Sequence, residues 1–116
     1  LARAIAFDPE LMIYDEPFTG QDPISLGVLT RLVRDLNDGL RMTSFVVSHD
    51  VTEVSKIADR ILLFAGGRLL ANDTPAAVYA STDPLVHQFM HAEADGPVAY
   101  HYPAADYAAE LLERVR

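Results

Sequence analysis

Short apolar runs alternate with amphipathic segments along the first half of the chain. Leu11–Tyr14 and Thr43–Ser48 are unbroken apolar or β-branched runs, and each predicts a strand buried on both faces. Between them, Asp22 and Pro23 are typical of an N-cap followed by the first residue of a helix. Apolar residues then recur at helical spacing as far as Gly39, which suits a C-cap. The pattern predicts strand, helix and strand in that order.

The second half of the chain predicts shorter elements. Asp50 and Glu53 stand at the spacing of a capping box, so we expect a short helix there. Two apolar segments, 60–65 and 68–72, are joined by Gly66-Gly67, and this predicts a hairpin because both turn residues tolerate a positive φ. Three further helices are expected, two beginning at Thr74-Pro75 and Asp83-Pro84 and a terminal one over Ala104–Arg116.

The order of these elements predicts the fold class. Alternation of strand and helix is typical of α/β architecture with parallel strands. We expect one domain over residues 1–90, with the hairpin at its end, and a helical extension over residues 91–116. Residues 98–116 carry more apolar surface than a solvated tail needs, so we expect them to dock on another chain, most simply a second copy.

Composition excludes several classes of function. The 116 residues carry 9 basic and 17 acidic side chains, a net charge of −8, and no cysteine. Without a basic stripe, binding to nucleic acid is not expected, and a thiolate metal site is excluded. No apolar run approaches the roughly 20 residues that span a bilayer. Because the first residue is Leu1 rather than methionine, we expect the chain to be part of a longer protein.

The residues that carry chemistry follow the two predicted strands. Asp15 and Glu16 come directly after the first strand, and Ser48-His49-Asp50 follows the second. Ligands of open parallel sheets bind at the carboxyl ends of the strands, so we expect these groups to share one crevice. Asp15 suits Mg²⁺, Glu16 suits a base that activates water, and His49 suits a donor to a γ-phosphate. The set predicts phosphoryl transfer from a magnesium nucleotide.

These motifs together resemble the ATP-binding-cassette (ABC) ATPases. Leu11–Pro17 is similar to their Walker B strand with its catalytic glutamate, and Gly20–Pro23 to their D-loop. Ser48–Asp50 resembles their switch histidine, and Leu1–Ala4 the helix that follows their signature sequence. More narrowly, Phe18–Pro23 and parts of the tail are similar to ATPase subunits of bacterial phospholipid transporters of the Mla/Mce type.

The resemblance implies a P-loop fold that binds ATP and Mg²⁺. It implies that Glu16 and His49 are catalytic, and that Asp15, Gln21 and Asp22 contact the nucleotide or its metal. Expected partners are a second nucleotide-binding subunit, a membrane permease and a small regulatory subunit, at the cytoplasmic face of the bacterial inner membrane. The phosphate-binding loop and the signature are missing from this sequence. The chain is therefore expected to be the C-terminal part of such a subunit and inactive alone.

Alternative interpretations remain for several of these residues. Asp15-Glu16 alone also fits an exposed acidic turn, His49 a structural histidine, and Asp22 a plain N-cap. His87 and His91 are four residues apart, a spacing able to bind a metal, but no carboxylate completes the set on that helical face. The function classes left open are a cassette ATPase of DNA repair or chromosome structure, and an interaction module without activity.

Overall fold

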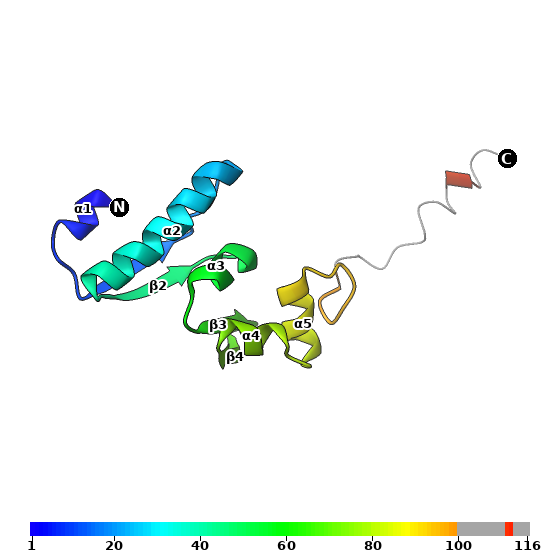
Figure 1. Cartoon of the computed structure of the whole chain (residues 1–116). Coiled ribbons are helices and arrows are strands. Elements are labelled where there is room, and N and C mark those ends of the chain that lie inside the picture. Colours follow the sequence, from blue (N-terminus) through cyan, green and yellow to red (C-terminus); the bar gives the residue numbers. More distant parts are fainter. Residues whose placement is uncertain (100–110, 113–116) are drawn as a thin grey trace.

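The computed structural model describes residues 1–99 and 111–112 of the chain (Figure 1). Its helices and strands follow the predicted order. The elements are α1 (Ala2–Ile5), β1 (Leu11–Asp15), α2 (Pro23–Leu40), β2 (Thr43–Val47), α3 (Val51–Ile57), β3 (Ile61–Ala65), β4 (Arg68–Asp73), α4 (Pro75–Tyr79) and α5 (Pro84–His91).

The strands β1 and β2 form a parallel pair. Their register runs from Leu11 opposite Thr43 to Asp15 opposite Val47. The long helix α2 makes the crossover between them, as a parallel connection requires (Figure 1). The prediction of an α/β arrangement is confirmed for this part of the chain, and both strands end at the same edge of the sheet.

Both strands are more exposed than their apolar sequences predict. In β1, Met12 and Tyr14 are buried, whereas Leu11 and Ile13 on the opposite face are exposed, Ile13 to 64%. Phe45 and Val47 of β2 are exposed as well. The expectation of strands buried on both faces is therefore wrong for the described residues, because helices pack on one face of this sheet and leave the other open.

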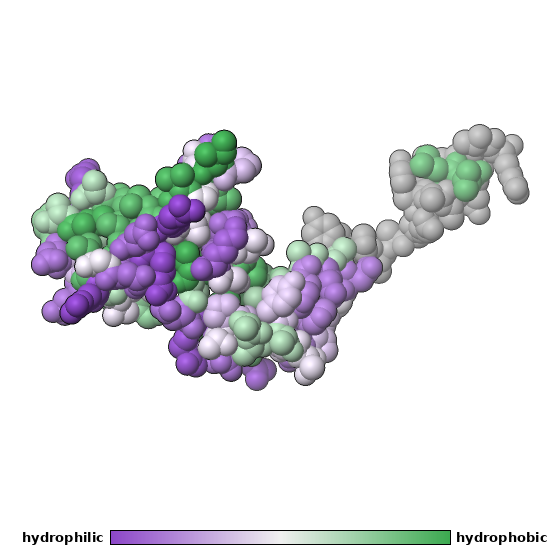
Figure 2. Space-filling view, viewed as in Figure 1, coloured by the Kyte–Doolittle hydropathy of each residue, from purple (hydrophilic) through white to green (hydrophobic). Residues whose placement is uncertain are grey.

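The buried side chains form two separate cores. In the first, α2 packs on β1, and in the second, α4 and α5 pack on the hairpin β3–β4. The first core comprises Met12, Tyr14, Phe18, Val33 and Met42, and the second Ile61, Leu63, Val78, Val86 and Met90. The first core reaches only one side of α2. At the N-terminal end of that helix Ile24 and Val28 are exposed, and Figure 2 shows apolar side chains gathered there.

The hairpin and most helix boundaries agree with the predictions. Gly66 and Gly67 have φ values of +55° and +72°, as a type I′ turn requires. Thr74 and Asp83 cap α4 and α5 through their side chains. The predicted N-caps of α2 and α3, Asp22 and Asp50, agree as well.

Two details of the helix ends differ from the predictions. Gly39 lies inside α2, and Arg41 takes the left-handed C-cap conformation with a φ of +53°. The helix continues this far because Met42, the next residue, packs into the first core. Asp50 accepts from the Glu53 backbone N–H, but the Asp50 backbone N–H donates to Ser48 Oγ. The reciprocal half of a capping box is thus not made.

The predicted terminal helix lies almost entirely outside the described residues. Of Ala104–Arg116 the structure describes Leu111 and Leu112, which are helical and exposed. The expected docking of residues 98–116 and the boundary at residue 90 stay predictions. Among the helices that the structure describes, none has the length and apolar character needed to cross a membrane.

Candidate functional site

The carboxyl ends of β1 and β2 bring the predicted site residues together. The Glu16 backbone N–H donates to the Val47 carbonyl at 2.8 Å, which continues the strand pairing one residue past β1. Glu16 has a φ of +45°, so the chain turns sharply there. The side chain of Glu16 consequently lies beside Ser48 and His49, which are 32 and 33 residues away in sequence.

Glu16 is the centre of a hydrogen-bonded cluster. Its Oε1 lies 2.9 Å from His49 Nδ1 and accepts from the His49 backbone N–H at 3.2 Å. Its Oε2 accepts from Ser48 Oγ at 3.1 Å and from Thr19 Oγ1 at 3.4 Å. The hydrogen bond from His49 lowers the pKa of Glu16, and the same bond raises the pKa of His49. The two groups favour each other's ionised forms.

Asp15 is the exposed end of β1, next to this cluster. Within residues 1–99, no side-chain hydrogen bond or ion pair of Asp15 is present, so both carboxylate oxygens can accept a ligand. No group of three or more His, Asp or Glu side chains able to hold a metal occurs in the described part of the chain. A single carboxylate fits Mg²⁺ bound together with substrate phosphates, since Mg²⁺ commonly takes one or two carboxylates and keeps several waters.

The Asp22 carboxylate is occupied by its own helix. It accepts from the backbone N–H groups of Ile24 at 2.9 Å and Ser25 at 3.1 Å, and from the Ser25 hydroxyl. The Ser25 bonds above all lower the pKa of Asp22. In the described residues no hydrogen bond joins Asp22 or Gln21 to Glu16 or His49, and the Gln21 side chain is exposed. The structure therefore joins Glu16 to His49, with Asp15 directly before Glu16 in the chain, and no hydrogen bond in the described residues links the Gln21–Asp22 turn to them.

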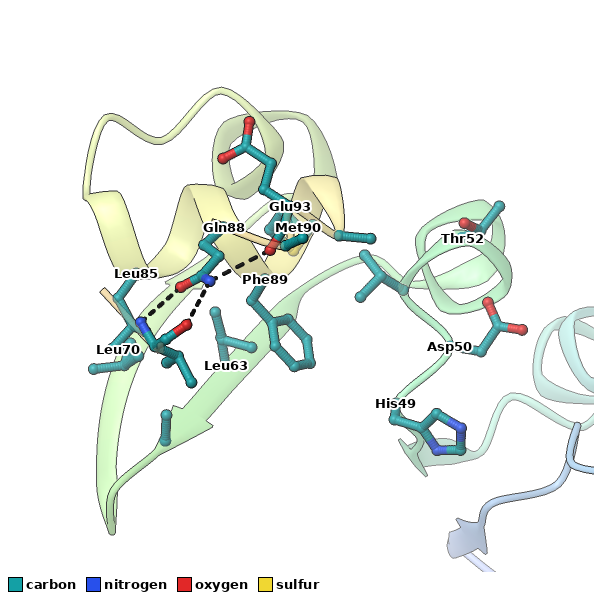
Figure 3. Close-up of a pocket in the computed structure, with 15 residues that line it drawn as sticks. His49, Asp50, Thr52, Leu63, Leu70, Leu85, Gln88, Phe89, Met90 and Glu93 are labelled. Atoms are coloured by element: carbon teal, nitrogen blue, oxygen red, sulfur yellow. Dashed lines mark hydrogen bonds between the residues drawn. The ribbon is translucent and has the colours of Figure 1, made fainter. Parts of the chain in front are cut away.

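A cavity of about 830 Å³ lies beside His49, between α3, the hairpin and α5 (Figure 3). Its lining is mainly apolar, and Phe89 extends from α5 toward the His49 side. This cavity was not among the features predicted from the sequence. A usable signal was present: Val86 and Met90 form the core stripe of α5, and Leu85 and Phe89 form a second apolar stripe beside it.

His87 and His91 do not form a metal site with a third ligand in the described residues. Their rings stack with centroids 4.0 Å apart, and the ring of Tyr79 lies 4.2 Å from that of His91. His87 Nδ1 lies 3.2 Å from Glu93 Oε2. These contacts give the two histidines a packing role at the end of α5.

Comparisons with known proteins agree with the class of protein that the order of the sequence motifs indicates. The chain is similar in sequence to ATP-binding subunits of bacterial transport systems. It is 53% identical, over 97% of its length, to the intermembrane phospholipid transport system ATP-binding protein MlaF of Haemophilus influenzae, and 52% identical to MlaF of Escherichia coli K12. A second group is more distant: the sulfate/thiosulfate import ATP-binding protein CysA of Xanthomonas campestris is 38% identical over 79% of the chain.

The extent of these matches differs between this chain and its relatives. The chain spans 43% and 42% of the two MlaF proteins and 27% of CysA. No protein-family model matches the chain. The predicted resemblance to phospholipid transport ATPases is confirmed, for a segment that covers about two fifths of their length.

Proposed function

We propose that the intact protein is the ATP-hydrolysing subunit of an ABC transporter that moves phospholipid across or from the bacterial inner membrane. The observation that carries this proposal is the 53% identity to MlaF over nearly the whole chain. Supporting it, Asp15, Glu16 and His49 lie at one sheet edge, where α/β proteins bind ligands. A cassette ATPase acting on DNA has no comparable support, since the chain has a net charge of −8.

Asp15 is the proposed ligand of Mg²⁺. Its carboxylate is exposed at the end of a strand and is not bound by another described side chain. When bound there with ATP, Mg²⁺ neutralises charge on the β- and γ-phosphate oxygens. The role of Asp15 is therefore to hold that charge next to Glu16, which follows it directly in the chain.

Glu16 is the proposed base and His49 the proposed donor to the γ-phosphate. The lowered pKa of Glu16 keeps its carboxylate ionised at neutral pH, so that it can orient water and accept its proton. An imidazolium donates from both ring nitrogens. With its raised pKa, His49 can thus hold Glu16 through Nδ1 and donate from Nε2 to a phosphate oxygen, where charge develops during transfer.

Gln21 and Asp22 are assigned different parts of the same turn. The Asp22 side chain is the N-cap of α2. The proposed contact of this turn with the nucleotide is therefore made by the exposed Gln21 and the backbone of the turn. The proposed assembly contains a second copy of the subunit, a membrane permease and a small regulatory subunit. It is placed at the cytoplasmic face of the inner membrane.

Residues 1–116 alone are proposed to be inactive. The sequence contains no phosphate-binding loop with its lysine, so ATP has no cradle for its β- and γ-phosphates. In the described residues β1 pairs only with β2, and the edges of this two-stranded sheet are unpaired, as expected if further strands of the intact protein complete it. We assign residues 1–90 to the nucleotide-binding domain and 91–116 to an extension.

The test uses the intact subunit assembled with its permease in phospholipid vesicles. We expect Mg²⁺-dependent ATP hydrolysis, and transfer of phospholipid that requires it. Asp15→Asn removes the charged metal ligand and is expected to weaken the Mg²⁺-dependent part of nucleotide binding. Asp35→Asn, an exposed position on α2, is the matched control and is expected to leave binding unchanged. An assembly that does not hydrolyse ATP would contradict the proposed function.

A further inference from the structure

Glu53 is an acidic side chain buried outside the cluster at the strand ends. It lies in the first turn of α3, four residues after His49, and is only 7% exposed. Its carboxylate lies 3.0 Å from Thr30 Oγ1 of α2, whose single hydroxyl proton it shares with the Leu26 carbonyl at 2.8 Å, and it pairs with Lys56. A buried carboxylate loses hydration that such partners only partly replace, and an apolar side chain of similar size often gives more stability. Stability of the fold alone is therefore a weak reason for a carboxylate here.

The direction of the Glu53 side chain is the informative feature. In a capping box it would turn back to the Asp50 backbone N–H, but that group donates to Ser48 Oγ instead. Glu53 reaches sideways to α2, 23 residues earlier in the chain. The first turn of α3 is thereby attached to the helix that follows the Gln21–Asp22 turn.

A continuous series of hydrogen bonds leads from Glu53 to Glu16. The Glu53 backbone N–H donates to Asp50 Oδ1 at 3.0 Å, the Asp50 N–H donates to Ser48 Oγ at 3.1 Å, and Ser48 Oγ donates to Glu16 Oε2 at 3.1 Å. His49 lies between Ser48 and Asp50 in the chain, and its side chain is largely exposed. Because packing holds the imidazole so little, its placement against Glu16 depends on the backbone between Ser48 and Asp50.

We propose that Glu53 is a positioning residue for the Glu16–His49 pair. Its bond to Thr30 fixes the first turn of α3 against α2, and the turn in turn fixes Ser48 and His49 at the Glu16 carboxylate. Glu53 itself does not touch the nucleotide. The inference rests on the proposed ATPase function, but it also makes a claim about the arrangement of His49 that is measurable without turnover.

The first test compares Glu53→Ala with Glu53→Gln in the intact subunit. Glu53→Ala is expected to lower kcat by about tenfold to a hundredfold, because displacing a reacting group by about 1 Å costs rate on that scale. The KM for ATP is expected to stay unchanged. Glu53→Gln keeps an oxygen that accepts from Thr30 and should restore most of the rate. Thr30→Val, which removes only the hydroxyl donor, should lower kcat, and Thr30→Ser should not.

A matched control loosens the same two helices about one turn further along each of them. Arg34 of α2 donates to the Ile57 carbonyl at 3.0 Å and to Asp59 at 2.9 Å, at the C-terminus of α3, eight residues after His49. Arg34→Gln is expected to lower the melting temperature and leave kcat unchanged. An equal loss of kcat in Arg34→Gln, or normal kcat in both Glu53→Ala and Thr30→Val, would overturn the proposal in favour of a purely structural contact.

The second test reads the position of His49 directly. The imidazole ¹³C–¹H signal of His49 is followed by NMR at pH 7 in the histidine-labelled intact subunit and assigned with a His49→Gln variant. In Glu53→Ala and Thr30→Val it should move toward its position in Glu16→Ala, in which the pair is broken. Signals that stay at the wild-type position would overturn the proposal. If the assembly does not hydrolyse ATP, the proposed function fails, and this measurement still decides the role of Glu53.

Discussion

Two regions of the molecule use their strands in different ways. The sheet region, residues 1–58, contains the parallel pair β1–β2 with α2 and α3, and the hairpin region, residues 61–98, contains the antiparallel pair β3–β4 with α4 and α5. Parallel strands end at one edge, so the residues that follow them meet. The antiparallel strands β3 and β4 have their carboxyl ends at opposite ends of the hairpin, and the Gly66-Gly67 turn occupies one of those ends.

The polar residues of the two regions differ accordingly. In the sheet region Glu16, Ser48 and His49 converge from separate segments. In the hairpin region Thr74 and Asp83 cap helices. The buried Gln88 side chain donates to the Val98 carbonyl and accepts from the Val98 backbone N–H (Figure 3). The comparison favours placing the proposed chemistry in the sheet region and gives the hairpin region a packing role. The variants below test this division in the intact subunit.

Glu16→Gln is expected to have the largest effect. The amide keeps the size and polarity of the side chain but cannot take the proton of the attacking water. Turnover of ATP should fall by about 10²–10⁴-fold, the usual contribution of a general base. Nucleotide binding, measured by fluorescence titration, should be preserved. Near-normal turnover would show that Glu16 is not the base, and it would contradict the main difference proposed between the two regions.

His49→Ala should come next. Loss of one preorganised donor to a transferring group costs on the order of 10²–10³ in rate. The effect should appear in kcat at saturating ATP rather than in affinity. His91→Ala is the control from the hairpin region, where the histidine stacks on His87 and has no proposed contact with ATP. Equal losses of kcat in the two variants would argue that the hairpin region shares in catalysis.

Local features of the structure were largely predictable from the sequence. The strand predicted over Leu11–Tyr14, which in the structure also includes Asp15, depends on a few neighbouring residues, as do the caps at Asp22 and Asp83 and the Gly66-Gly67 turn. The meeting of Glu16 and His49 at one edge also followed, because it needs only adjacent parallel strands. Their direct hydrogen bond depends in addition on the register of β1 against β2, which no local pattern reveals.

Features that depend on distant packing were not predictable. The exposure of Ile13 and Phe45 reflects the lack of a covering helix on that face of the sheet within the described residues, which the strands' own sequences do not reveal. The shift of the α2 C-cap from Gly39 to Arg41 follows from where Met42 packs. The bond between Glu53 and Thr30 crosses between helices, whereas the spacing of Asp50 and Glu53 predicted a local capping box. In each case a tertiary contact outweighs a correct local preference.

Val86→Ala tests the packing role of the hairpin region. Val86 is 1% exposed in the second core, and truncation leaves a cavity. The free energy of unfolding should fall by about 1–3 kcal/mol, measured by denaturant titration. kcat of the folded protein should stay unchanged, in contrast to Glu16→Gln. A loss of kcat larger than the loss of folded protein would show that the two regions are coupled.

The smallest effect is expected from the ionic contact between Glu16 and His49, and it should depend on pH. The hydrogen bond from Glu16 raises the pKa of His49 above its ordinary value of 6.5, so the stabilisation is present below that pH and is lost as pH rises through the raised value. His49 lowers the pKa of Glu16 below 4.5, so the stabilisation is present above that pH and is lost as pH falls through the lowered value.

Both groups are therefore charged together, with their full effect on folding, between pH 4.5 and 6.5. The coupling free energy from a double-mutant cycle of Glu16→Gln and His49→Gln should be largest near the middle of that range and decline toward pH 9. Because both side chains are solvent-accessible, the coupling should be small and should weaken further in high salt. The loss of stability in Val86→Ala involves no ionisable group and should be nearly independent of pH. A coupling free energy that is equally independent of pH would mean that the Glu16 and His49 side chains meet as neutral hydrogen-bonding groups. The charge that distinguishes the sheet region from the hairpin region would then come from Asp15 and the bound nucleotide.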